Sequence, residues 1–193
     1  MRLALGSFLC FSFAAFLRAQ APASPAPAGL LPEWDIRAIL EEMSAHATRL
    51  GPVLAQIDTA AWVKKGASET YAQQLQSSKE QAVALAEGAK ALAQNPEKLS
   101  ASLELYFRIT GLEDMLSSLG AGVRQYQDAA LAGTLASLAA ENGANRNRFQ
   151  TYIVNLAAQR EQECEVMDRE AQRCRGVVAT QPAVSAPGNG GKK

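Results

Sequence analysis

Apolar residues recur along the chain at alternating intervals of four and three residues. This spacing places them on one face of an α-helix, as in helices that pack against one another. The pattern runs through four segments, at residues 36–57, 71–92, 105–126 and 131–156. Short connections between such segments make consecutive helices antiparallel. The sequence therefore predicts an all-α domain over residues 33–176, folded as an up-down antiparallel four-helix bundle with flexible termini.

Glycine, proline and capping residues predict where these helices bend and end. Pro52 falls inside the first segment without shifting its phase, so we expect the first helix to be kinked near Pro52 and to continue. Asp58 is suited to cap a short helical turn that ends at Gly66. Farther along the chain, Asn95 suits the N-cap of the third helix and Pro96 suits its first helical position.

The fourth helix is the longest and the most highly charged. Unbroken from Asp128, its expected cap, to Arg175 it would measure about 70 Å. It must therefore overhang the bundle or bend near Asn142, which precedes a glycine. Its charged C-terminal part suits either a partner-binding arm or a solvated helix end. We expect Gly176 to end the helix and residues 177–193 to form a disordered tail.

The composition favours helix and narrows the range of functions. The 193 residues include 37 alanines but a single histidine, and 19 acidic residues balance 19 basic ones. Alanine has the highest helix propensity of all residues. A single histidine excludes metal sites that need two or three imidazoles. The zero formal net charge argues against a nucleic-acid partner, which calls for a basic surface.

The N-terminus has the layout of a secretory signal peptide, residues 1–20. A basic start precedes an uncharged apolar run from residue 3 to residue 17, which is short for a membrane-spanning helix. Cleavage after Ala19 and cleavage after Ala21 both fit, and an uncleaved N-terminal anchor is the alternative. Residues 21–32 form an extended leader rich in proline and alanine. The mature chain, with 17 basic and 19 acidic residues, is expected to be periplasmic or extracellular and to lack a transmembrane segment.

Two cysteines, Cys164 and Cys174, remain after removal of the signal peptide. In an oxidising compartment such residues are able to form disulfides. They would stand about 15 Å apart along an unbroken helix, whereas a disulfide needs Cα atoms within about 7 Å. Three interpretations stay open: an intermolecular disulfide, a helix that ends before Cys174, or two free thiols. Their spacing does not fit a metal site.

Asn142 and Asn145 interrupt the apolar face of the fourth segment. Buried asparagine at such a position fixes the register of packed helices or marks a local break. Alternatively, the two asparagines together with Arg146 and Arg148 line a polar pocket able to hold an anionic group. The sequence leaves both interpretations open.

Glu42 and His46 share one helical face, one turn apart. A di-metal site in a helical bundle takes a Glu-x-x-His motif from each of two helices, and this chain has neither. The sequence also lacks the motifs of a serine hydrolase and of covalent haem attachment. We therefore expect no metal, no cofactor and no enzymatic activity.

The segments EWDIRAILEEMSAHA, NPEKLSASLELYFRITGLEDML and MDREAQRCRG resemble exported, all-helical bacterial proteins that have no known activity. The resemblance covers most of the mature chain and implies an exported helical domain. The sequence thus favours a non-catalytic interaction or structural protein of the cell envelope or extracellular space, which binds a partner protein or itself. A bundle that holds a hydrophobic or anionic small molecule is the alternative, and an enzyme is the third hypothesis.

Overall fold

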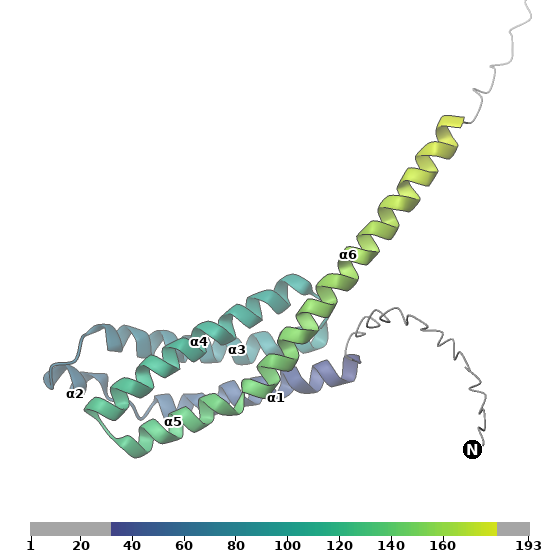
Figure 1. Ribbon diagram of the computed structural model, residues 1–193. Helices are drawn as coiled ribbons and strands as arrows, with labels where there is room; N and C mark the ends of the chain where they lie inside the picture. Colours follow the sequence, from purple (N-terminus) through teal and green to yellow (C-terminus); the bar gives the residue numbers. More distant parts are fainter. Residues whose placement is uncertain (1–31, 181–193) are drawn as a thin grey trace, which may run out of the picture.

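The computed structural model describes residues 32–180, which are almost entirely helical (Figure 1). The helices are α1 (Glu33–Leu54), α2 (Thr59–Lys64), α3 (Thr70–Gln94), α4 (Leu99–Tyr126), α5 (Ala129–Glu141) and α6 (Gly143–Thr180). The all-α class is confirmed, and this part of the chain contains no strand. The predicted signal peptide, the leader up to residue 31 and the tail from residue 181 lie outside the described residues.

The helices pack around one core, with the short α2 at one end of the molecule (Figure 1). α1 packs mainly against α3, α3 against α4, and α4 against α5 and α6. Both α5 and α6 also contact α1, which closes the arrangement. Residues 32–180 thus form six helices. They are the four predicted long helices, of which the fourth is divided into α5 and α6, and the short helix α2, which was expected after Asp58.

The alternating apolar positions form the core. In the first segment all seven such residues are at most 6 % exposed: Ile36, Leu40, Met43, Ala47, Leu50, Leu54 and Ile57. Where α1 meets α3 several buried residues are small, so these two helices approach each other closely: Ala47, Ser78, Ala82 and Ala89. Full burial of a large apolar side chain contributes about 1.5–3 kcal/mol. The repeated pattern is therefore the largest source of stability in the fold.

Three predicted helix boundaries are confirmed. Asp58 caps α2 by accepting a hydrogen bond from the amide three residues later (2.9 Å). Asp128 caps α5 by accepting from the amides of Leu131 and Ala130 (3.0 and 3.2 Å), and these bonds lower the pKa of its carboxyl group. Gly66 follows α2 with a φ of +93°, in the left-handed region that glycine adopts without steric cost.

The two prolines near helix ends behave differently. Pro52 lies inside α1, which continues to Leu54 as the unbroken phase of the pattern indicates; the kink itself stays a prediction. The prediction that Asn95 and Pro96 begin a helix is wrong, since Asn95 follows the end of α3 and α4 begins three residues after Pro96. The carbonyl of Pro96 accepts a hydrogen bond from the hydroxyl of Tyr152 (3.0 Å), and this long-range contact holds the segment as a loop.

The fourth predicted helix is interrupted and also overhangs the bundle. The interruption lies at Asn142, between α5 and α6. α6 has 38 residues, about 57 Å at the usual rise per residue, and its second half projects beyond the other helices (Figure 1). The prediction that Gly176 ends the helix is wrong, because α6 continues to Thr180. A helix tolerates an internal glycine at a cost of about 1 kcal/mol.

Candidate functional site

Polar side chains gather at the junction of α5 and α6. Asn142 lies there, 4 % exposed, and His46 of α1, 5 % exposed, borders the same cavity. This cavity measures about 10 Å³, and most of its other lining residues are apolar. Neither Oδ1 of Asn142 nor Nδ1 of His46 has a hydrogen-bond partner among the described residues. A void of this size is about enough for one water molecule and too small for a substrate.

A wider cleft of about 290 Å³ opens outside the junction, lined by Glu42, Ala45, His46, Arg49, Glu141, Asn142 and Asn145. Nδ2 of Asn145 donates to Oε2 of Glu42 (2.8 Å), and Arg49 forms an ion pair with Glu141 (2.8 Å). Burial, and secondly the charge of Arg49, lower the pKa of His46, while Glu141 opposes the shift. His46 is therefore a neutral side chain at pH 7.

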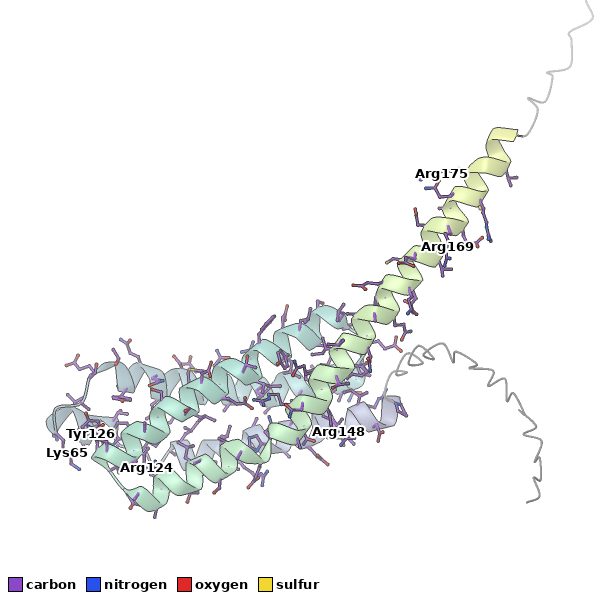
Figure 2. The ribbon with its side chains drawn as sticks, viewed as in Figure 1. Lys65, Arg124, Tyr126, Arg148, Arg169 and Arg175 are labelled. Carbon is purple, nitrogen blue, oxygen red and sulfur yellow. The ribbon has the colours of Figure 1, made fainter. Side chains whose placement is uncertain are left out.

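The structure brings together only part of the predicted anion pocket. The two asparagines line the cleft, whereas Arg146 pairs with Glu113 of α4 and Arg148 is exposed on α6 outside the cleft (Figure 2). Two carboxylates against one arginine leave the lining negative, which does not suit an anion. Sequence spacing could not reveal that Glu42 lies beside Asn145, since the two are 103 positions apart.

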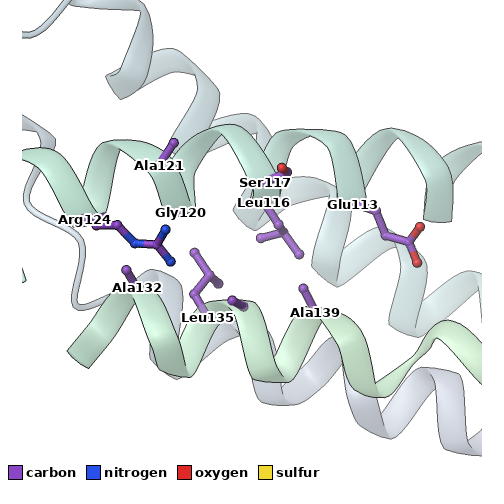
Figure 3. A pocket seen from close by; sticks show the side chains of 10 residues that line it. Glu113, Leu116, Ser117, Gly120, Ala121, Arg124, Ala132, Leu135 and Ala139 are labelled. Atoms are coloured by element: carbon purple, nitrogen blue, oxygen red, sulfur yellow. The ribbon is translucent and has the colours of Figure 1, made fainter. Parts of the chain in front are cut away.

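Shallow grooves lie between helices elsewhere on the bundle, and two of them are large enough for a small molecule. One, of about 410 Å³, separates α4 from α5, with Arg124 near one end and Glu113 near the other (Figure 3). The second, of about 510 Å³, lies between α1 and α3. Its lining is largely apolar and includes Ala47, Ala82 and the 59 % exposed Val83. Both grooves are within the usual size range of ligand pockets, roughly 300–1,000 Å³.

The second half of α6, residues 161–180, is here called the arm. Arg160 marks its base by pairing with Glu97 (3.1 Å) at the end of the bundle and with Glu163 (2.7 Å) in its own helix. Beyond Glu163, every side chain through residue 177 is exposed. The apolar side chains of Val166 and Met167 are 48 % and 63 % exposed. The arm thus presents all its faces to the surroundings.

Cys164 and Cys174 both lie on the arm, exposed and not joined to each other. They belong to one continuous helix, on which ten residues span about 15 Å. The interpretation in which the helix ends before Cys174 is therefore wrong. An intermolecular disulfide and two free thiols both stay open.

The described residues show neither a metal site nor a membrane-spanning helix. Within residues 32–180, no group of three or more His, Cys, Asp or Glu side chains is arranged to hold a metal ion. In the same range, none of the helices combines the length and the apolar character needed to cross a membrane. No protein-family model, curated protein or solved structure compared with this chain matches it.

Proposed function

We propose that the chain is an exported, non-catalytic interaction protein whose arm binds another protein chain. The exposure of the arm carries this proposal. A helix that is solvated on every face is stable only with a partner or with many ion pairs along its surface. The pairs Arg160–Glu163 and Glu170–Arg173 lie at the surface, where ion pairs contribute little to stability. A partner that covers the exposed apolar side chains of the arm would supply the missing stabilisation.

On this proposal the remaining helices are a rigid base for the arm. α5 and the buried half of α6 count as one bent helix, and with α1, α3 and α4 they make an up-down antiparallel four-helix bundle. The reversal of chain direction between successive long helices supports this arrangement (Figure 1).

The lack of catalysis and the export of the chain are parts of the same proposal. His46, the single histidine, is buried beside a cavity of about 10 Å³, which supports a structural role for this side chain. Export is inferred from residues 1–20 and from the resemblance to exported helical proteins. The balanced charge supports a protein partner over a nucleic acid.

Removal of the arm tests the proposal. A chain that stops after Glu163 keeps the ion pairs of Arg160 and is compared with the full chain, both made with the native N-terminus. We expect both forms to be exported and to unfold within a few degrees of each other. Chemical cross-linking in the exporting cell should trap the full chain in a larger assembly and leave the shortened chain alone. Identical cross-linked species from both forms would count against a role of the arm.

A bundle that binds a hydrophobic small molecule is the second candidate. The groove between α1 and α3 favours it, since about 510 Å³ with apolar lining is within the usual range of ligand pockets, roughly 300–1,000 Å³. Native mass spectrometry of the exported protein without reductant separates the two candidates. A single chain with additional bound mass supports the small-molecule function, whereas a mass of two chains supports the interaction function.

A further inference from the structure

One face of the arm carries a row of small and apolar side chains. Cys164, Met167, Ala171 and Cys174 follow one another at intervals of three, four and three residues, and all four are exposed. This is the heptad spacing of a coiled coil, with the first and third residues at position a and the others at position d. We call these four residues the seam. Nothing in the described part of the chain covers it.

We propose that the seam pairs with the seam of a second copy of this chain, with the two arms antiparallel. This inference rests on the proposed function and names the partner of the arm. In an antiparallel pair centred near Arg169, Cys164 faces Cys174 of the second copy, and Met167 faces Ala171 of the second copy. Each pair of facing residues is therefore compatible. Two cysteines are able to form a disulfide, and a large side chain packs against a small one. A twofold axis repeats both contacts, as in most homodimers.

The position of the bundle decides the direction of the arms. At about 100° per residue, the seam is centred about 40° around the helix axis from Leu156, which is buried against the bundle. The seam thus lies on the same side of α6 as the bundle, but beyond its end. If the two arms were parallel, both bundles would lie at the same end of the pair. Each bundle would also lie on the side of its α6 that faces the other copy, so the two bundles would overlap. Antiparallel arms place the bundles at opposite ends, so each arm covers the free face of the other.

The facing cysteines are close enough to form disulfides in this arrangement. Packed helices have axes about 8–10 Å apart, and each Cα atom lies about 2.3 Å from its own axis. Cα atoms that face each other therefore come within the limit of about 7 Å that a disulfide requires. Each bridge forms when the two thiols lose their protons and pass two electrons to a protein disulfide of the exporting compartment, which is reduced to a dithiol.

The bridges also explain how so small a contact could persist. The seam offers only four short or unbranched side chains per copy, so the two arms bury less surface than the roughly 1,200 Å² of a standard stable interface. Without bridges the pair should be weak. Two covalent links turn the association into an intramolecular contact at an effective concentration of the order of millimolar.

Serine variants test the direction of the arms. Every form carries Cys10→Ser, is exported with its native N-terminus and is purified without reductant. We expect a dimer on a non-reducing gel that dithiothreitol dissociates, and a cross-linked peptide that joins Cys164 to Cys174. Cys164→Ser alone and Cys174→Ser alone should each abolish the covalent dimer, since every remaining thiol then faces a serine. Equal mixing of the two variants in a redox buffer should restore a dimer with one bridge.

Covalent dimers of the single variants would contradict the antiparallel direction. Parallel arms would set each cysteine against itself, so each single variant would still form a covalent dimer. That outcome would overturn the antiparallel inference and leave the arm as an interaction surface.

A charge placed in the seam tests the surface itself. Ala171→Glu should lower the dimer fraction at least tenfold, whereas Gln172→Glu adds the same charge on another face and should leave the dimer unchanged. Equal dimer fractions in both variants would overturn the seam as the contact. If every form is monomeric but the arm-dependent cross-links persist in the cell, the second copy is the wrong partner and the proposed function stands. If those cross-links are also missing, both proposals fail.

Discussion

The indole N–H of Trp62 donates a hydrogen bond to Oε1 of Gln127, 65 positions later in the chain, at 3.0 Å. The same oxygen accepts a bond from the backbone amide of Asp58 (3.0 Å), and Nε2 of Gln127 donates to the carbonyl of Gln56 (2.7 Å). One side chain therefore fastens the connection between α1 and α2 to the connection between α4 and α5.

Replacement of Gln127 by Met should lower the free energy of unfolding by about 1–3 kcal/mol. The side chain of Trp62 is completely buried, so its N–H would lose its partner without gaining water. Urea unfolding followed by circular dichroism measures the change. Gln125→Met is the matched control, since Gln125 is exposed two residues earlier in α4. Equal losses in the two variants would mean that the hydrogen bonds of Gln127 contribute nothing.

Gly122→Ala should destabilise the bundle by about 1–3 kcal/mol, because the added methyl group overpacks the core. A Cβ atom at Gly122 would lie 2.8 Å from Cζ3 of Trp62 and 3.1 Å from Cε1 of Tyr71. Gly111 of the same helix is the control, since a Cβ there would meet nothing within 4 Å. Gly111→Ala should stabilise α4 by up to about 1 kcal/mol through helix propensity. Thermal unfolding of both variants checks the opposite signs.

The main features of the fold could be predicted from the sequence, and its long-range contacts could not. The alternating apolar spacing identified the buried face of each long helix, because that face follows from a local period. Asp58 and Asp128 were recognisable as caps for the same reason, since a cap acts on the next turn of its own helix. The loop at Pro96 was not, because its conformation depends on Tyr152 of a distant helix.

The stability of the protein should fall as the pH drops below about 6.5, through the titration of His46. The pKa of His46 is lowered in the folded state, so the unfolded chain binds more protons between that lowered value and about 6.5. The contribution of neutral His46 to the free energy of unfolding is therefore fully present above this pH window. It decreases as the pH falls through the window and levels off below it. Chemical unfolding at several pH values between 5 and 7.5 measures the slope. His46→Gln should flatten the curve in this range, and an unchanged slope would assign the effect to other groups.

The two asparagines near the helix junction should respond to alanine in opposite ways. Asn142→Ala should raise the free energy of unfolding by up to about 1 kcal/mol, since it removes a buried oxygen without a partner and improves helix propensity. Asn145→Ala should lower it by about 0.5–1.5 kcal/mol through loss of the bond to Glu42. Denaturant titration compares the two variants. A loss of stability in Asn142→Ala would show that Oδ1 is hydrogen-bonded to water in solution.

The candidate sites were harder to predict than the helices. Sequence reasoning gave a break at Asn142 as one of several interpretations, and the interruption between α5 and α6 lies there. It grouped Asn142 with two arginines only because they are neighbours along the chain. In the folded protein Arg146 is held by Glu113, and the other groups of the cleft come from α1. The charged end of α6 was visible as an arm, because a helix of that length exceeds the bundle. Which face of the arm contacts a partner depends on a second molecule. A single sequence contains no record of that contact.

The uneven burial of α6 has a consequence for hydrogen exchange. Up to Leu156 the helix is anchored in the core, so its amide protons should exchange only when the whole bundle unfolds. Beyond Glu163 no side chain through residue 177 is buried in the single chain, so in the reduced, unpaired protein the amides there should exchange through fraying from the C-terminal end. Protection should therefore decrease by orders of magnitude within about two turns of an unbroken helix. α6 is continuous in its geometry, but its two halves open separately. The amides of the buried half therefore stay protected when the arm frays.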